Sequence, residues 1–195
     1  MNDITNSPER MEEKFFEEQV KIEKEFEKIE LVAEKITEKY KEYQSLQSFV
    51  LYLKGMEKVF AQAKLSNWKD TKTKEELIKT EMHFFSMDSG VDEDIFLTIR
   101  DDFGMVYTTV KQVYEATEKL LEKYAACAEC KEFIEYMKKI SLLFIEAKKE
   151  NWDTQIIKEN LYKYRMKKLS ADGDPRLEVL EDVRMEFERE LSKSV

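Results

Sequence analysis

Hydrophobic and polar positions follow a helical period in two parts of the chain. In the first part, hydrophobic residues recur every seven positions, at Phe15, Ile22, Ile29, Ile36 and Tyr43. Phe26, Ala33 and Tyr40 lie four positions after three of them, so the steps alternate between four and three. The same steps return between residues 99 and 127. This period places the hydrophobic side chains along one face of a helix, as in the seam of a coiled coil. The pattern therefore predicts two long helices, at 8–44 and 91–125.

The two long helices begin two copies of one sequence unit. When the sequence is shifted against itself by 84 positions, more than a third of the aligned positions from Glu34 to Asp88 carry identical residues. Asn67-Trp68 aligns with Asn151-Trp152, and the same Phe-x-x-Ala-Lys stretch precedes both dipeptides. A third, partial copy begins at residue 179, where the hydrophobic pattern of 95–103 returns. The sequence thus predicts an internal duplication.

The sequence therefore predicts an all-α fold. It consists of a three-helix unit of about 84 residues in tandem duplication, followed by a C-terminal capping helix. Seven helices are predicted, at 8–44, 46–65, 72–87, 91–125, 128–149, 154–169 and 175–192. The chain has only 4 glycines and 2 prolines, which suits long helices because these residues dominate tight turns.

The domain organisation follows from the repeat. We expect a disordered N-terminus at 1–7, repeat units at 8–90 and 91–174, and a capping helix within 175–195. All of these are expected to form one continuous structural domain. The pattern leaves open whether the helices close into bundles or stack as a short solenoid.

The charge of the chain limits the partners that we expect. A net charge of −9 disfavours binding to nucleic acid or to an acidic membrane surface, since both would repel the chain. No hydrophobic run approaches the roughly 18 to 20 residues that cross a bilayer, so we expect a cytoplasmic protein without membrane contact. Residues 127–170 differ from the rest because they carry 10 basic and 7 acidic side chains. This positive region is where we expect a partner to dock.

The candidate partner-binding residues are two tryptophans and one basic, aromatic helix. Trp68 and Trp152 occupy equivalent positions, where a tryptophan either buries its ring at a helix corner or lines a notch for a ligand. The helix predicted at 154–169 contributes Lys158, Tyr162, Tyr164, Arg165 and Lys168. Such a helix is either a solvated face with packed aromatic rings or a cationic surface on which single-stranded bases stack.

Cys127 and Cys130 are the only cysteines, and they have CxxC spacing. Cys127 continues a hydrophobic seam, which favours packing; thiol redox chemistry and a metal shared across a dimer are the alternatives. The only histidine, His83, lies near no nucleophile or metal ligand in the sequence. The sequence contains no Gly-rich phosphate loop and no metal-ligand spacing. We therefore expect no catalytic residues, no cofactor, no metal and no enzymatic activity.

The function that we expect is that of a non-enzymatic helical-repeat adaptor or scaffold that binds a protein or peptide. Two alternatives remain open. One is a nucleic-acid-associated regulator that uses the basic helix at 154–169. The other is a structural homo-oligomer, such as a homodimer, in which the long heptad helices pair between chains.

Overall fold

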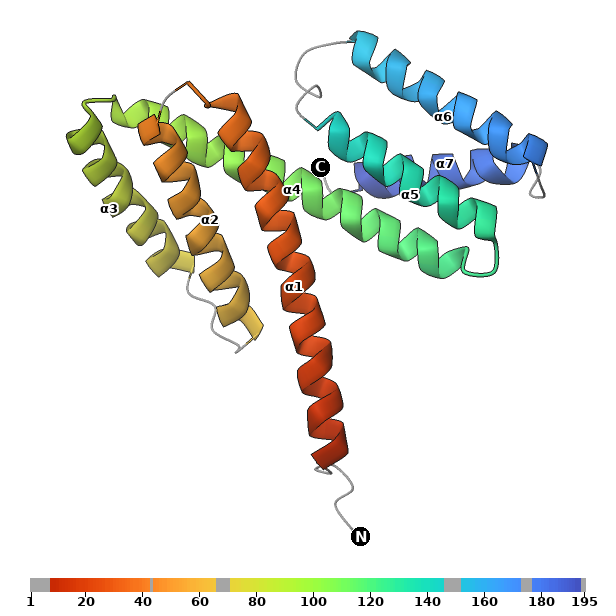
Figure 1. Cartoon of the computed structure of the whole chain (residues 1–195), viewed down its shortest axis with the longest axis horizontal. Coiled ribbons are helices and arrows are strands. Elements are labelled where there is room, and N and C mark those ends of the chain that lie inside the picture. Colours follow the sequence, from red (N-terminus) through yellow and green to blue (C-terminus); the bar gives the residue numbers. More distant parts are fainter. Residues whose placement is uncertain (1–7, 43, 66–70, 146–151, 173–176, 194–195) are drawn as a thin grey trace. The chain divides into compact units, whose positions relative to one another are not determined.

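The computed structural model describes residues 8–42, 44–65, 71–145, 152–172 and 177–193. Within these ranges the chain is helical and contains no strand, as the hydrophobic period predicts (Figure 1). The seven helices are α1 (Pro8–Lys39), α2 (Gln44–Leu65), α3 (Thr71–Ser89), α4 (Glu93–Lys123), α5 (Ala128–Leu143), α6 (Trp152–Asp172) and α7 (Leu177–Ser192). The all-α fold class is confirmed for the described part of the chain.

The helix ends differ from the predicted ends by a few residues. α1 ends at Lys39 and not at residue 44. α5 ends at Leu143, and Phe144 closes it by donating its backbone N–H to the Ile140 carbonyl. Most of the predicted continuation of this helix to residue 149 lies outside the described residues, as does the predicted disorder at 1–7.

Gly90 marks the break between α3 and α4. Its φ of 67° is a left-handed conformation, which glycine adopts without steric strain. Its backbone N–H reaches the Ser86 carbonyl at 3.0 Å and satisfies one of the last acceptors of α3. The sequence predicts a break between the helices at 72–87 and 91–125, and the structure has this break at residues 90–92.

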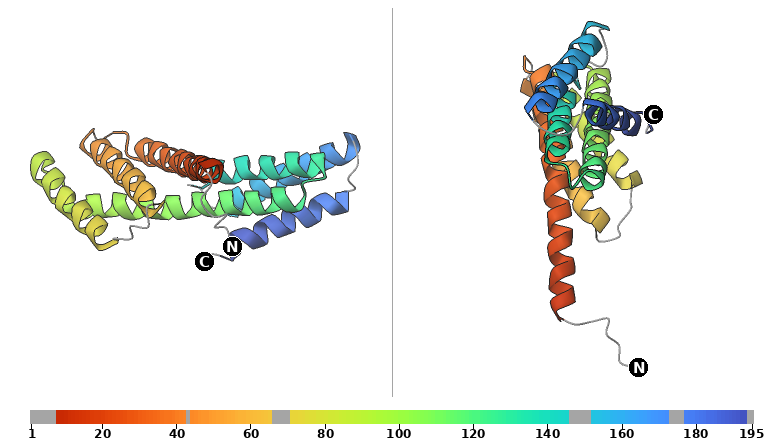
Figure 2. Two further views of the ribbon diagram at one scale, coloured as in Figure 1. Left: turned by 90° about the horizontal axis from the view of Figure 1, so that it is seen from below. Right: turned by 90° about the vertical axis from the view of Figure 1, so that its right-hand side faces the viewer.

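The chain divides into two compact units, Met1–Tyr107 and Thr108–Val195, which we call unit 1 and unit 2. The boundary falls inside α4, which is one continuous helix (Figure 2). Unit 1 therefore contains α1, α2, α3 and the first half of α4, and unit 2 contains the rest of α4 with α5, α6 and α7. The division predicted at 90–91 follows the sequence repeat and not these units, and it stays a prediction.

Each unit has its own hydrophobic core, to which four helices contribute. The core of unit 1 includes Ile29, Val32, Ile36, Leu46, Phe49, Val50, Leu53, Ile78, Met82, Phe96, Ile99 and Phe103. The core of unit 2 includes the residues that lie 84 positions later, which are Val113, Ala116, Leu120, Cys130, Phe133, Ile134, Met137, Tyr162, Met166, Leu180, Val183 and Phe187. All of these residues are at most 7% exposed. Buried positions thus recur with the interval that separates the sequence copies.

Among the described helices, none combines the length and the hydrophobicity of a membrane span.

Candidate functional site

The two tryptophans of the predicted site fall where the structure gives little detail. Trp68 lies outside the described residues. Trp152 is the first residue of α6, but its side chain lies outside the description. The proposed tryptophan notch in each copy therefore stays a prediction.

Tyr162, in contrast, is placed clearly, and its ring is fully buried in the core of unit 2. Its hydroxyl lies 3.0 Å from Ser141 Oγ and donates to the Met137 carbonyl at 3.3 Å. The ring meets Phe133 edge-on, with 6.3 Å between the centroids, and Lys158 Nζ lies 5.7 Å from the centroid of the Tyr162 ring. Burial raises the pKa of the Tyr162 phenol well above its usual value. This tyrosine therefore packs inside the unit and presents no ring to solvent.

Arg165 ties α6 to α5. It forms an ion pair with Glu132, and its guanidinium carbon lies 5.4 Å from the centroid of the Tyr136 ring. Tyr164 and Lys168 point elsewhere, because Tyr164 is 70% exposed and Lys168 is exposed as well. The predicted set is thus divided between the core, a helix–helix contact and the solvent-facing side of α6.

The solvent-facing side of α6 borders a groove that we call the α6–α7 groove. It has a volume of about 520 Å³ and is lined by Lys163, Met166, Lys167, Leu177, Glu178, Glu181 and Asp182. The floor is apolar, since Met166 is 3% exposed and Leu177 is 43% exposed. The lysines come from α6 and the three carboxylates from α7. The groove therefore has one cationic wall, one anionic wall and an apolar floor between them.

Glu181 in the anionic wall is held in its ionised form. Its pKa is lowered, first by its hydrogen bond with Arg184, while partial burial acts in the opposite direction. Lys163 on the opposite wall also lowers the pKa of Glu181 through its positive charge. The two walls therefore influence each other electrostatically across the groove.

Sequence reasoning did not include the α7 wall in the site. The acidic character of 171–195 is visible in the sequence, where 8 acidic residues stand against 4 basic ones. Which of these carboxylates face the lysines of α6 depends on how α6 and α7 pack, and no local pattern shows it.

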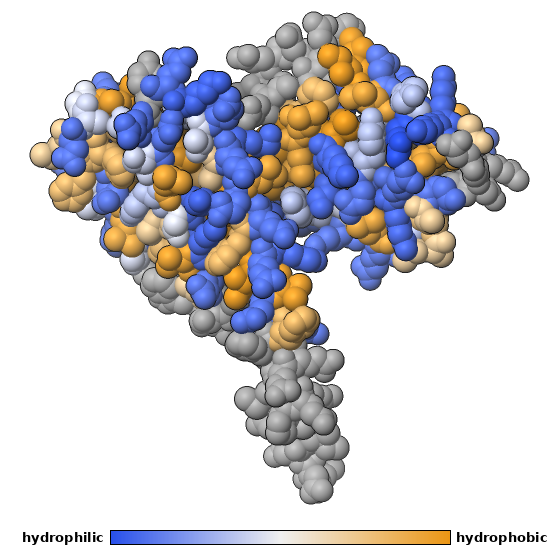
Figure 3. Space-filling model, in the orientation of Figure 1, coloured by the Kyte–Doolittle hydropathy of each residue, from blue (hydrophilic) through white to orange (hydrophobic). Residues whose placement is uncertain are grey.

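An apolar surface lies beside the groove-forming helices. Figure 3 shows hydrophobic surface over the C-terminal part of α5 and the beginning of α6. The exposed apolar residues of these two segments are Leu143, Ile156 and Ile157. This surface lies within the region 127–170, where the charge pattern predicts docking.

Unit 1 contains a second groove, which we call the α2–α4 groove. It has a volume of about 730 Å³ and is lined by Leu53 and Glu57 of α2, by Lys74, Glu75, Ile78 and Lys79 of α3, and by Arg100, Asp101, Phe103, Gly104 and Met105 of α4. Leu53, Ile78 and Phe103 form a buried apolar floor. The charged residues stand at its edges, where Lys74 is paired with Glu57.

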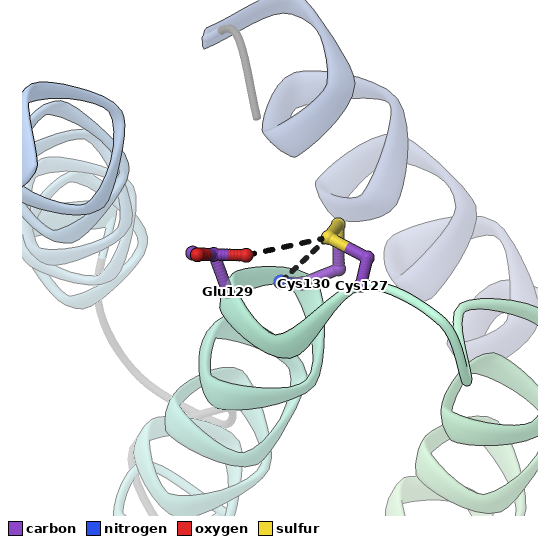
Figure 4. The surroundings of a disulfide bond; sticks show 3 residues. All are labelled: Cys127, Glu129 and Cys130. Carbon is purple, nitrogen blue, oxygen red and sulfur yellow. Dashed lines mark hydrogen bonds between the residues drawn. A yellow bond between two sulfur atoms is a disulfide. The ribbon is translucent and has the colours of Figure 1, made fainter. Parts of the chain in front are cut away.

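Cys127 and Cys130 form a disulfide at the N-terminus of α5 (Figure 4). Cys127 is the N-cap residue, and its Sγ accepts the backbone N–H of Cys130 at 3.2 Å. Cys130 is fully buried in the core of unit 2, whereas Cys127 is partly exposed. Both cysteines therefore pack in or against the core of unit 2, as the seam predicts for Cys127, and they are also covalently linked.

The remaining candidate chemistry is limited in the part of the chain that the structure describes. His83 has a side chain that is 62% exposed, and its Nδ1 lies 3.9 Å from a Glu93 carboxylate oxygen. No group of three or more histidine, cysteine, aspartate or glutamate side chains in this part is arranged to hold a metal ion.

Comparison with known proteins gives no relative for this chain: no family model, no curated protein and no solved structure matches it.

Proposed function

We propose that the protein is a non-enzymatic helical-repeat adaptor that holds a segment of a partner protein in the α6–α7 groove. The observation that carries this proposal is the arrangement of the groove, in which lysines and carboxylates face each other across Met166 and Leu177. Helix-in-groove recognition uses such a surface, because an amphipathic helix places its apolar side chains on the floor and its charged flanks against the walls. The volume of about 520 Å³ lies within the range of ligand sites in proteins.

The walls indicate the chemistry of the partner. Lys163 and Lys167 form no ion pair with any described residue, so they remain available for acidic side chains. Glu178 and Asp182 are similarly available for basic side chains. We infer that the partner segment is an amphipathic helix with an apolar stripe, an acidic flank and a basic flank.

A tandem duplication is part of the same proposal. α4 and α7 begin at Glu93 and Leu177, and α2 and α5 begin at Gln44 and Ala128, so equivalent helices start one repeat interval apart. The recurrence of buried positions supports the same origin. The wall residues differ between the copies, because His83, Leu97 and Thr98 stand where unit 2 has Lys167, Glu181 and Asp182. We propose that the two copies diverged in what they bind.

The test is selection of helical peptides from a display library on the purified full-length chain. Peptides of the predicted charge pattern are expected to bind, and Lys163→Glu with Lys167→Glu is expected to weaken them about tenfold, because each exposed ion pair contributes about 0.2–1 kcal/mol. Lys139→Glu is the matched control, since Lys139 is an exposed lysine of α5 outside the groove. Binders that are insensitive to the double reversal would exclude this groove as the site.

The two alternative functions are addressed by independent measurements. The regulator alternative needs bases to stack on tyrosines, and the buried ring of Tyr162 leaves Tyr164 as the exposed tyrosine of α6. Binding to a single-stranded oligonucleotide that falls steeply with added salt would support it. A homo-oligomer would be detected by light scattering.

The compartment that we propose is the cytoplasm. Disulfides are rare there because glutathione and thioredoxin keep thiols reduced. In that compartment Cys127 and Cys130 are expected to form a dithiol.

A further inference from the structure

We propose that the α2–α4 groove of unit 1 is a second binding site, which takes a partner segment that carries an aromatic ring and a carboxylate. This inference goes beyond the proposed function, because it concerns a different unit and a different ligand chemistry. It rests on a comparison of equivalent positions in the two units, each considered by itself.

An aromatic ring in unit 2 has no counterpart in unit 1. In unit 2, the Tyr162 hydroxyl contacts Ser141 Oγ and the Met137 carbonyl. The equivalents of Ser141 and Met137 in unit 1 are Glu57 and Leu53, and both line the α2–α4 groove. The equivalent of Tyr162 itself is Ile78, which is shorter and has no ring. The groove in unit 1 therefore lies where unit 2 places a phenol ring from its own chain.

Two carboxylates of unit 2 also have no counterpart in unit 1. Arg184 in unit 2 is held by two carboxylates, with Nε at 3.1 Å from Glu181 and Nη1 at 2.9 Å from Glu188. The equivalent arginine in unit 1 is Arg100, but the positions equivalent to Glu181 and Glu188 are Leu97 and Gly104.

Arg100 lacks these two carboxylates and donates instead to its neighbour in the chain, Asp101. Its Nε and Nη2 lie 3.0 Å and 2.7 Å from one oxygen of Asp101, whose side chain is 68% exposed. The side chain of Arg100 is itself 34% exposed, against 18% for Arg184. An exposed neighbouring pair of this kind is weak, so Arg100 can accept a carboxylate from another molecule.

The space and the charges around Arg100 suit such a carboxylate. A Cβ added to Gly104 would meet no atom within 4 Å, so the surface of α4 is open beside the groove. Lys79, also in the lining, forms no ion pair with any described residue. Glu57, at the place of Ser141, is paired with Lys74 through Oε1, and its second oxygen can accept a hydrogen bond from an incoming phenol. The ligand is therefore an acidic, aromatic segment, with tyrosine and glutamate as the simplest pair of side chains.

The experiment introduces the side chains of Tyr162 and Glu188 at the equivalent positions of unit 1, so that they fill the α2–α4 groove. The variant is Ile78→Tyr with Gly104→Glu, and it is expected to fold because unit 2 accommodates the same pair. The probes are the peptides acetyl-Tyr-(Gly)n-Glu-amide with no spacer or a spacer of up to about four glycines, a reach set by about 3.3–3.6 Å per residue. Binding is followed through the backbone amide signals of the ¹⁵N-labelled full-length chain.

We expect saturable shifts of the Lys79 and Gly104 amides for at least one spacer length, and a loss of affinity of at least about tenfold in the filled variant. Replacement of the tyrosine by leucine or of the glutamate by glutamine in the probe is expected to weaken binding as well. No saturable shift with any probe, or equal binding to the filled variant, would overturn the proposal. A concentration-dependent dimer that the filled variant abolishes would also overturn it, because the occupant would then be a second copy of the chain.

Two controls keep this result separate from the proposed function. Lys163→Glu with Lys167→Glu alters only the α6–α7 groove, so it is expected to leave binding of the tyrosine–glutamate probe unchanged. If the double variant loses helical circular dichroism, Gly104→Glu alone replaces it, because the added side chain points into open space. That single variant is expected to weaken the glutamate-dependent part of the binding.

Discussion

The Tyr40 hydroxyl donates a hydrogen bond to Asp102 Oδ2 at 2.5 Å, and 84 positions further along the chain the Tyr124 hydroxyl donates one to Glu186 at 3.2 Å. A lysine joins each pair, since Lys39 Nζ lies 2.6 Å from Asp102 and Lys123 pairs with Glu186. Each of the two clusters links the C-terminal end of a long helix to the helix three further along the chain. The clusters therefore repeat a polar contact as well as a hydrophobic core.

The first prediction concerns the unequal burial of these two carboxylates. Asp102 is 5% exposed, whereas the side chain of Glu186 is 21% exposed. Asp102→Ala removes a buried carboxylate that accepts from both Tyr40 and Lys39, so we expect it to lower the free energy of unfolding by about 2 kcal/mol. Glu186→Ala is expected to lower it by about 1 kcal/mol, because water can replace the lost carboxylate.

Urea unfolding followed by circular dichroism measures both values. Tyr40→Phe is the matched control, because it removes one hydrogen bond and keeps the carboxylate paired with Lys39. A greater loss of stability for Glu186→Ala than for Asp102→Ala would contradict the prediction.

The second prediction concerns alkaline pH. Burial is the main cause that raises the pKa of five phenols, with a nearby carboxylate adding to it in each, and these phenols belong to Tyr40, Tyr52, Tyr107, Tyr124 and Tyr162. In the unfolded chain tyrosine ionises near pH 10. The folded state holds these protons more tightly, so its stability is complete below about pH 10 and is lost as the pH rises further.

A titration that follows phenolate absorbance and helical circular dichroism together tests this coupling. We expect most of the phenolate absorbance to appear with the loss of helix. Full ionisation at pH 10 in a chain that keeps its helical signal would show that the tyrosines are not protected by the fold.

The third prediction concerns acid pH. The pKa of Glu30 is lowered from 4.5, mainly by its hydrogen bond with Lys58 and then by Lys54. Hydrogen bonds with Arg184 and Lys123 lower the pKa of Glu181 and Glu186 in the same way. A carboxyl group with a lowered pKa in the folded state stabilises it above about pH 4.5, and this stabilisation is lost as the pH falls through the lower folded-state value.

Melting temperatures measured between pH 7 and pH 3 test this dependence. We expect them to fall below about pH 4.5, and to fall less in Lys54→Gln with Lys58→Gln, because Glu30 then loses both cations. An unchanged pH dependence in that double variant would mean that Glu30 does not contribute.

The helices and the core positions could be predicted from the sequence, because hydrophobic residues recur with the period of an α-helix. Positions such as Ile29 and Val113 lie on the hydrophobic stripe of a long helix, and any such stripe must be covered by other helices. The burial of Tyr162 was accessible as well, because its counterpart in the first copy is the hydrophobic Ile78. For this ring, the alternative of a packed aromatic side chain describes what the structure has.

Other features of the candidate sites depend on tertiary packing. The ion pair between Arg165 and Glu132 joins residues 33 positions apart on different helices, and no local pattern selects that partner. The same holds for the carboxylates of α7 that face Lys163. The α2–α4 groove also depends on tertiary packing, because its lining residues come from α2, α3 and α4.

The last prediction concerns the disulfide between Cys127 and Cys130. The closed loop runs only from Cys127 to Cys130, and the chain-entropy relation for so short a loop gives a stabilisation of about 2 kcal/mol. Reduction with dithiothreitol is therefore expected to lower the melting temperature by about 4–8 °C, a range that follows from about 2–4 °C per kcal/mol for a chain of this size. The helix should persist in the reduced protein, because Cys130 remains buried in the core and the Cys127 sulfur still caps α5.

The control is Cys127→Ser with Cys130→Ala, in which serine is a good N-cap residue and alanine a small apolar one. The melting temperature of this variant should not respond to dithiothreitol. An equal response of the control and the natural chain would show that the reductant acts elsewhere, and no response of the natural chain would show that the disulfide does not stabilise the fold.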